Sequence, residues 1–223
     1  MKTKYLTNNN VVILVAHPDD ETLWAGGVLL ENPSWNVFIV SLCRGSDGDR
    51  APKFKKVLKK LEADGKMDDL DDGPEQNPLN PLELERSMVR HLPSGSIDLL
   101  ITHSPFGEYT RHRRHEEIGN AVISLWKNAQ IKIDELWLFA YEDGNRAHYP
   151  TPIAEAHQIY VLSEKIRKEK YRIITEIYGF APESWEALAC PEAEAFWQFS
   201  TASKAYEWQQ KTGRAYEYRN TKL

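Results

Sequence analysis

The sequence predicts an α/β protein with a mostly parallel sheet and helices on both faces of that sheet. One observation behind this prediction is a set of short, continuous apolar runs, the pattern of strands buried on both faces. The other is that segments of helical character separate these runs along the first two thirds of the chain. Strands that alternate with helices favour a parallel sheet covered by helices on each side.

Four strands are expected, and the first is the most distinct. It covers residues 11–16, where Val-Val-Ile-Leu-Val-Ala contains no polar residue, and a second run, Val-Phe-Ile-Val-Ser-Leu, covers 37–42. Later runs predict strands at 98–102 and 135–140. Helices are expected between these runs, at residues 22–30, 53–63, 82–91 and 115–127.

Two further segments do not follow this alternation. Residues 64–81 are rich in Asp, Gly, Pro and Asn and predict a long exposed loop, whose acidic run is expected to be solvated rather than to bind calcium. The part from Pro150 on is mainly helical in pattern, and ten aromatic residues lie between Tyr178 and Tyr218. We interpret these aromatic residues as packing residues, with a sugar-stacking wall or a subunit interface as alternatives.

The composition limits the class of protein. The chain has 223 residues, 41% hydrophobic and 27% charged, which predicts a single globular domain over residues 1–223. The net charge of −5 and the lack of a basic block give no support for nucleic-acid binding. Two cysteines exclude a disulfide scaffold. No apolar stretch is long enough for an export signal or a membrane-spanning helix, so no membrane insertion and a cytoplasmic location are expected.

A group of acids directly follows the first predicted strand. Residues 17–21 read His-Pro-Asp-Asp-Glu, and Pro18 can open a helix whose first turn contains the three acids. An acidic helix start is the simpler explanation, but three adjacent acids concentrate more charge than helix capping requires. Ligands of open α/β sheets bind at the carboxyl ends of strands, so this position is a candidate site.

A second group follows the third predicted strand. His112 and His115 are three residues apart, so at a helix start they share one face. This pair alone is a weak signal, but together with His17 and Asp20 it forms a candidate metal site of two histidines and one carboxylate. His103, at the end of that strand, is expected to support the site or the core rather than to act as a fourth ligand.

These residue types suit the hydrolysis of an amide or an ester. A divalent ion lowers the pKa of bound water to about 7 and so supplies hydroxide at neutral pH. A carboxylate beside the ligands, Asp19, can take the proton of the water and pass one to a leaving amine. A histidine that is not a ligand, such as His112, can donate to the oxyanion of a tetrahedral intermediate.

The run Ala-His-Pro-Asp-Asp-Glu with a downstream His-x-x-His resembles the PIG-L/LmbE family of zinc-dependent N-acetylglucosamine deacetylases. The resemblance extends from about Val11 to Phe199, nearly the whole chain, and the first motif is highly specific. It implies a Rossmann-like sheet, often in oligomers, so a homo-oligomer is one expectation. The implied activity is removal of the acetyl group from an N-acetylglucosamine-type sugar or conjugate.

The resemblance also implies roles for individual residues. The cofactor is expected to be zinc, with Fe²⁺ or Mn²⁺ as alternative occupants of the same ligands. The segment at 44–50 looks like the substrate loop of the family, and Arg50 matches its sugar-binding arginine. Carried over position by position, the zinc ligands fall on His17, Asp20 and His115, the general base on Asp19, and the oxyanion-stabilising histidine on His112.

The sequence departs from the family pattern at one position. Members commonly have an aspartate that supports the oxyanion-stabilising histidine, and Arg114 stands there instead. An arginine cannot accept the hydrogen bond of His112. We hypothesise that Glu108, or another nearby acid, takes the place of the missing partner, and we group Glu108 with Arg50 as a substrate-binding candidate.

Two alternatives to a zinc-dependent N-deacetylase stay open. Non-haem iron oxygenases bind their metal through two histidines and a carboxylate, and the presence of Asp19 beside the site weighs against that class. The other alternative is a non-catalytic α/β module that binds a sugar or a metal. The substrate depends on connections over the sheet, and residues 64–81 and 145–152 are the expected specificity loops.

Overall fold

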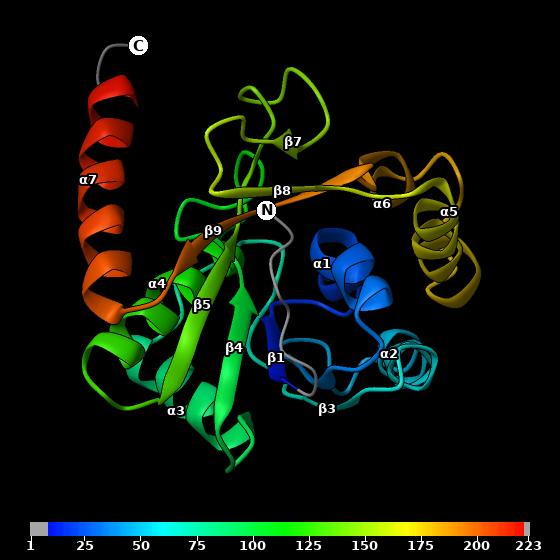
Figure 1. Ribbon diagram of the computed structural model, residues 1–223, viewed down its shortest axis with the longest axis horizontal. Coiled ribbons are helices and arrows are strands. Elements are labelled where there is room, and N and C mark those ends of the chain that lie inside the picture. Colours follow the sequence, from blue (N-terminus) through cyan, green and yellow to red (C-terminus); the bar gives the residue numbers. More distant parts are fainter. Residues whose placement is uncertain (1–8, 221–223) are drawn as a thin grey trace.

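A seven-stranded sheet forms the centre of the computed structural model, which describes residues 9–220 (Figure 1). Its strands are, in spatial order, β3 (Asp64–Met67), β2 (Asn36–Ser41), β1 (Asn10–Val15), β4 (Ile97–Thr102), β5 (Ile133–Phe139), β9 (Ala193–Phe199) and β8 (Gln158–Val161). The first five of these strands are parallel, whereas β9 runs antiparallel to both of its neighbours. This is the predicted fold class, a Rossmann-like and mostly parallel sheet.

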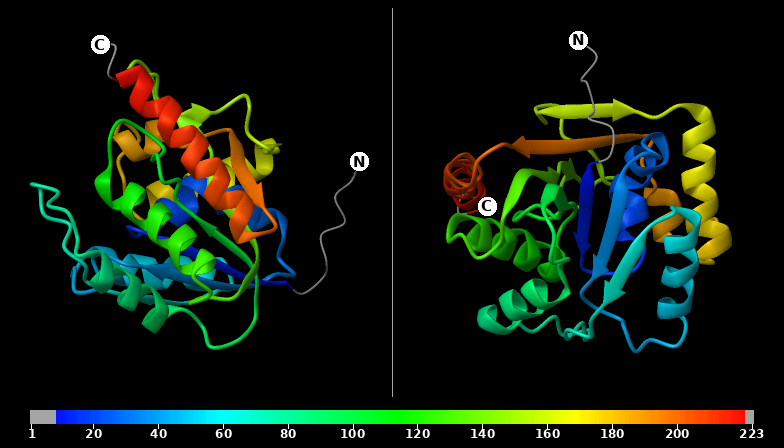
Figure 2. Two further views of the ribbon diagram at one scale, coloured as in Figure 1. Left: turned by 90° about the vertical axis from the view of Figure 1, so that its left-hand side faces the viewer. Right: turned by 60° about the horizontal axis from the view of Figure 1, so that its bottom comes forward.

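Helices cover both faces of the sheet, as Figure 2 shows from two directions. One face carries α1 (Asp20–Glu31), α2 (Arg50–Lys60), α5 (Glu164–Arg172), the π-helix η1 (Ile173–Ile177) and α6 (Trp185–Ala189). The other face carries α3 (Pro81–His91), α4 (Arg113–Lys127) and α7 (Ala202–Asn220). A two-stranded ribbon of β6 (Tyr141–Glu142) and β7 (Thr151–Pro152) stands apart from the main sheet.

The pleat of β1 explains why residues 11–15 are all apolar. Val11, Ile13 and Val15 are buried in the core beneath α1 and α2, and the alternate residues Val12 and Leu14 are buried beneath α3 and α4. Both faces of this part of the strand are therefore covered. The register aligns β1 with β4, so the residues that follow the two strands meet at one edge of the sheet.

The four predicted strands and the four predicted helices all form, with bounds shifted by a few residues. One expectation was wrong, because the segment 64–81 does not begin as a loop: β3 pairs with β2 at the edge of the sheet. The part after Pro150 contains α5, η1, α6 and α7, but it also contains β8 and β9, which were not predicted.

Strands β3 and β9 were not predicted because polar or charged residues interrupt both of them. Strand β3 reads Asp-Gly-Lys-Met, and β9 carries a buried glutamate among its first residues. The prediction of one domain over residues 1–223 includes 1–8 and 221–223, which lie outside the described residues, as do the side chains of Tyr216 and Tyr218. Among the helices of residues 9–220, none is both long and apolar enough to span a membrane.

Candidate metal centre and catalytic pocket

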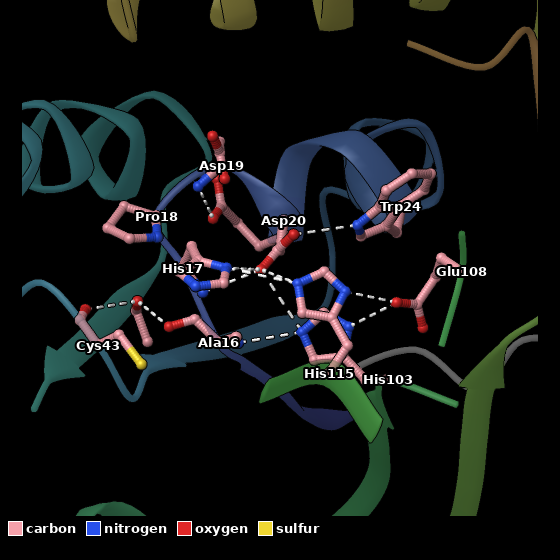
Figure 3. Close-up of polar contacts among 12 residues, drawn as sticks. Ala16, His17, Pro18, Asp19, Asp20, Trp24, Cys43, His103, Glu108 and His115 are labelled. Carbon is pink, nitrogen blue, oxygen red and sulfur yellow. Dashed lines mark hydrogen bonds and ion pairs between the residues drawn. The ribbon is translucent and has the colours of Figure 1, made fainter. Parts of the chain in front are cut away.

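The predicted site residues converge at the carboxyl edge of the sheet. His17 follows β1, Asp20 begins α1, and His103 follows β4. His112 caps the N-terminus of α4, and His115 lies in the first turn of that helix. Figure 3 shows Asp20 pointing at three imidazoles from these separate elements.

The three predicted metal ligands form a nearly equilateral triangle of donor atoms. Nδ1 of His17 lies 3.2 Å from Oδ2 of Asp20, and Nε2 of His115 lies 3.4 Å from each of those two atoms. A tetrahedral ion with bonds of about 2.0–2.2 Å separates its ligand atoms by roughly 3.4 Å. The donor set therefore fits one divalent ion, with borderline nitrogen and oxygen ligands of the kind that zinc accepts.

The carboxylate of Asp20 is held from two sides. Its Oδ1 accepts a hydrogen bond of 3.1 Å from Nε1 of Trp24, four residues further along α1, and its Oδ2 accepts one of 2.9 Å from the backbone of His17. Burial alone would raise the pKa of Asp20, but His115 and His103 hold that pKa well below its usual range. The carboxylate is therefore ionised and ready to bind a cation.

Glu108 lies behind the histidines rather than in the pocket. Its Oε2 is 2.6 Å from Nδ1 of His115 and 3.1 Å from Nδ1 of His103, and its Oε1 accepts from the backbone of Ser104. Nε2 of His103 accepts a hydrogen bond from the backbone of Ala16, so the proton of its ring is on Nδ1. A carboxylate on Nδ1 of His115 likewise leaves Nε2 of that ring free as a ligand.

These contacts correct the hypothesis about Glu108. The side chain is fully buried, both of its oxygens have partners, and neither partner is His112. It supports His115, and it does not line the pocket where a substrate contact would require it. His103 contacts the same carboxylate of Glu108, and its expected role in support of the site stays a prediction.

Asp19, the predicted general base, lies beside the ligands and lines the pocket. Its Oδ2 accepts a hydrogen bond of 2.9 Å from Nη1 of Arg50, the first residue of α2. Burial, and then the charge of Asp20, raise the pKa of Asp19 to about 8, although Arg50 opposes this shift. A carboxyl group with a pKa near neutrality is suited to exchange protons with a substrate.

The backbone of Asp19 is also unusual. Its φ of 129° lies in a region that residues other than glycine rarely occupy, and its amide donates to Oε2 of Glu21. Glu21 is fully buried and accepts a hydrogen bond of 2.7 Å from the hydroxyl of Tyr178. Glu21, the third acid of the motif, therefore holds the turn that presents Asp19 to the pocket. Strained backbone of this kind is often found at functional sites.

His112, the predicted oxyanion-stabilising residue, also lines this pocket. Its ring stacks on that of His115 at 4.2 Å between centroids and meets that of His17 edge-on at 4.7 Å. Its Nδ1 is buried without a hydrogen-bond partner in the described part of the chain. Burial, and then the neighbouring His115 and His17, lower the pKa of His112 to about 3.

The pocket above these residues has a volume of about 230 Å³. One wall is aromatic, because the ring of Tyr109 packs against that of Trp185 with centroids 4.7 Å apart. Arg50 packs across the ring of Phe180 at 4.5 Å and so stays at the rim. The lining residues are His17, Pro18, Asp19, Asp20, Leu23, Arg44, Arg50, Asp72, Tyr109, His112, Trp185 and Glu186.

Sequence reasoning did not single out four residues that the structure brings to this site. Trp24 is one helical turn after Asp20, and that spacing was a usable signal. Tyr109 is adjacent to the second motif, but nothing in the pattern marks it. Asp72 lies in an expected specificity loop, and Trp185 is one of the aromatic residues for which a sugar-stacking wall was an alternative, but no local signal separates either residue from its neighbours.

The sheet and the donors at its carboxyl edge define a Rossmann-like α/β protein with a candidate metal site. The chain belongs to the PIG-L family: residues 12–126 match the family model described as GlcNAc-PI de-N-acetylase. This confirms the family that the two motifs indicate. Membership supports a hydrolase of the deacetylase type.

One curated protein and two solved structures are similar to this chain. A curated relative, uncharacterized protein L374 of Acanthamoeba polyphaga mimivirus, is 24% identical over 73% of this chain and 76% of its own length. The solved N,N'-diacetylchitobiose deacetylase of Pyrococcus horikoshii is similar, with a TM-score of 0.66, 15% identity and coverage of 88% and 85%. GalB, the 4-carboxy-2-hydroxymuconate hydratase of Pseudomonas putida KT2440, is similar at a TM-score of 0.55, with 13% identity and coverage of 85% and 95%. The fold therefore hosts more than one reaction.

Proposed function

We propose that this protein is a zinc-dependent deacetylase that hydrolyses the acetamide of an N-acetylglucosamine-type sugar or conjugate. The observation that carries the proposal is the triangle of donor atoms on His17, Asp20 and His115, with Asp19 and His112 lining the same small pocket. Family membership supports the same reaction class.

His17, Asp20 and His115 would hold the ion, which when bound lowers the pKa of a water molecule and polarises the acyl oxygen. Asp19 would accept a proton from the attacking water at Oδ2, the oxygen that Arg50 fixes in place. The same carboxyl group would then give that proton to the sugar nitrogen as the carbon–nitrogen bond breaks, which forms acetic acid and the free amine. Transfer of the acid proton to the amine gives acetate and an ammonium group, so the atoms and charges balance.

His112 is proposed to stabilise the charge that develops on the acyl oxygen. Its Nδ1 is buried, unpaired within the described residues and adjacent to the ligand histidines, so a substrate oxygen can take this nitrogen as its partner. Arg114 binds the carbonyls of Asp71 and Asn77 instead, and no acid among the described residues accepts a hydrogen bond from Nδ1 of His112.

The substrate class follows from the shape of the pocket. Its volume of about 230 Å³ is below the range of about 300–1,000 Å³ for sites of drug-sized ligands, so it suits one ring with an acyl group. The paired rings of Tyr109 and Trp185 offer an apolar surface to one face of a sugar, and Arg50 and Glu186 offer polar contacts at the rim. The homo-oligomer implied by the resemblance and the cytoplasmic location stay predictions.

A panel of substrates tests this proposal. Metal-stripped protein with added zinc is incubated with N-acetylglucosamine, N,N'-diacetylchitobiose and N-acetylglucosaminyl inositol, and released acetate is measured. Release from at least one compound is expected. No release from any of them by zinc-loaded protein contradicts the proposed substrate class, and water addition to 4-carboxy-2-hydroxymuconate would move the assignment to a hydratase. Oxygen consumption with iron and a 2-oxo acid would favour the oxygenase alternative.

A further inference from the structure

The loop between β3 and α3 is docked onto the helix that carries His115. Arg114 is fully buried, donates 2.5 Å from Nε to the carbonyl of Asp71 and 2.6 Å from Nη2 to that of Asn77, and pairs with Glu117. The amide of Leu79 donates to the other oxygen of Glu117 at 3.1 Å. Two side chains of α4 thus bind three backbone groups of the loop, which was expected to be exposed.

This docking brings Asp72 to the pocket. Its Oδ1 lies 3.1 Å from Nε2 of His17 and accepts a hydrogen bond of 3.0 Å from Gln76. Its Oδ2 accepts two from Arg44, at 2.6 and 3.0 Å. Only 7% of the Asp72 side chain is exposed, so these contacts replace water almost completely. The carboxylate meets the ring nitrogen of His17 that faces away from Asp20 and His115.

We propose that Asp72 is a positioning residue for His17 and that Arg114 keeps Asp72 in place by closing the loop. This inference rests on the proposed metal site. A carboxylate oxygen 3.1 Å from Nε2 of His17 favours the ring proton on that nitrogen, so Nδ1 presents its lone pair to the ion.

The same contacts give Arg114 a role at the position where the family commonly has aspartate. A guanidinium can donate to the carbonyls of Asp71 and Asn77 at once, because its donors form a rigid planar fork. A carboxylate has no proton to donate at neutral pH, so it could not bind these carbonyls. In this chain Arg114, between His112 and His115, binds the loop, and the loop in turn places the carboxylate of Asp72 against His17.

The zinc dissociation constant, measured by competition with a chromophoric chelator, tests this inference. Asp72→Ala is expected to weaken zinc binding roughly 10–100-fold, and Asp72→Asn less, because the amide oxygen can still lie beside Nε2. Glu75→Gln, which removes an exposed charge from the same loop, is the matched control and is expected to bind zinc as the unaltered protein does. Thermal unfolding of the metal-free variants checks that each one folds.

The role of Arg114 is tested by a double-mutant cycle. Arg114→Lys keeps the charge and loses the fork, so the amides of residues 68–80 are expected to exchange hydrogen faster and zinc to bind more weakly. The double variant Arg114→Lys with Asp72→Ala is expected to bind zinc no more weakly than Asp72→Ala alone. Both changes act through the same contact, that of Asp72 with His17. Losses that simply add would overturn the link between Arg114 and Asp72.

The proposed metal site and the proposed role of Asp72 can be disproved separately. If the unaltered protein binds zinc tightly and Asp72→Ala binds it equally well, the positioning role is wrong while the metal site stands. If the unaltered protein does not bind zinc, the metal site and this inference both fall.

Discussion

Both ligand histidines have one ring nitrogen against a carboxylate and the other directed at the candidate ion. His115 has Glu108 at Nδ1, and His17 has Asp72 at Nε2. Opposite tautomers are therefore fixed on the two rings, and Trp24 holds the third ligand, Asp20. At the residue scale the site is prearranged, because the supporting groups are buried and hydrogen-bonded.

The general base is the first residue to test at this scale. Asp19→Asn is expected to lower kcat for deacetylation by about 10²- to 10⁴-fold, since the amide cannot accept the proton of the water. Zinc affinity is expected to stay within a few-fold, because Asp19 is not part of the donor triangle. Asp49→Asn, an exposed acid close to Arg50 in the chain, is the control. Unchanged kcat in Asp19→Asn would remove Asp19 from the mechanism.

The aromatic wall gives a second prediction for single residues. Trp185→Ala is expected to raise KM roughly three- to tenfold and leave kcat nearly unchanged, because the ring contacts the sugar and not the reacting bond. Leu188→Ala, an exposed position on the same short helix, serves as the control. A loss confined to kcat would contradict a stacking role for Trp185.

At the scale of elements, α4 combines three tasks. It carries His112 and His115, and through Arg114 it holds the loop that supplies Asp72. Helix α4 packs closely against the residues that follow β4. A Cβ added to Gly119 would lie 2.5 Å from the nitrogen of Pro105 and 2.6 Å from the oxygen of His103. This close approach brings His115 within stacking distance of His103, 3.8 Å between ring centroids.

Gly119→Ala tests this packing. The new methyl group meets backbone atoms, so α4 must move away from β4, and we expect a loss of about 1–3 kcal/mol in the free energy of unfolding. Zinc binding is expected to weaken as well, because His115 moves with the helix. Gly95→Ala, where an added Cβ meets nothing within 4 Å, is the control for glycine replacement. Equal stability of Gly119→Ala and the unaltered protein would show that the contact is not tight.

The elements and the site differ in how far sequence could predict them. The strands with long apolar runs and both ligand motifs were predictable, because burial on two faces and the adjacent acids leave local signals. Strand β8 is only four residues long, and polar or charged residues interrupt β9. Asp72 lies in a loop that Arg114 binds 37 and 43 residues away in the chain, and such long-range docking has no local pattern.

At the scale of the whole molecule, a buried ion pair joins the C-terminal strand to the helix of the ligand Asp20. Glu194 of β9 accepts hydrogen bonds of 2.7 Å from Nζ of Lys170 and from the amides of Gly27 and Val28. Both charged side chains are fully buried. The pair therefore connects β9 and α5 with α1, and through α1 with the site.

Breaking this pair is expected to destabilise the whole fold. Lys170→Met leaves Glu194 buried with an uncompensated charge, which costs about 3–5 kcal/mol in the free energy of unfolding. Lys168→Met, an exposed position on the same helix, is expected to change stability little. Urea unfolding monitored by circular dichroism measures both, and a Lys170→Met protein as stable as its control would contradict the role of the pair.

Titration of the metal-stripped protein with zinc, with acetate release measured after each addition, decides whether one ion at His17, Asp20 and His115 supports deacetylation. Activity is expected to be absent without metal, to rise in proportion to zinc and to level off at a single equivalent per chain. In His115→Ala the same titration is expected to restore little activity. Acetate release that is equal with and without metal, or unaffected in His115→Ala, would contradict the metal centre at the heart of the proposed function.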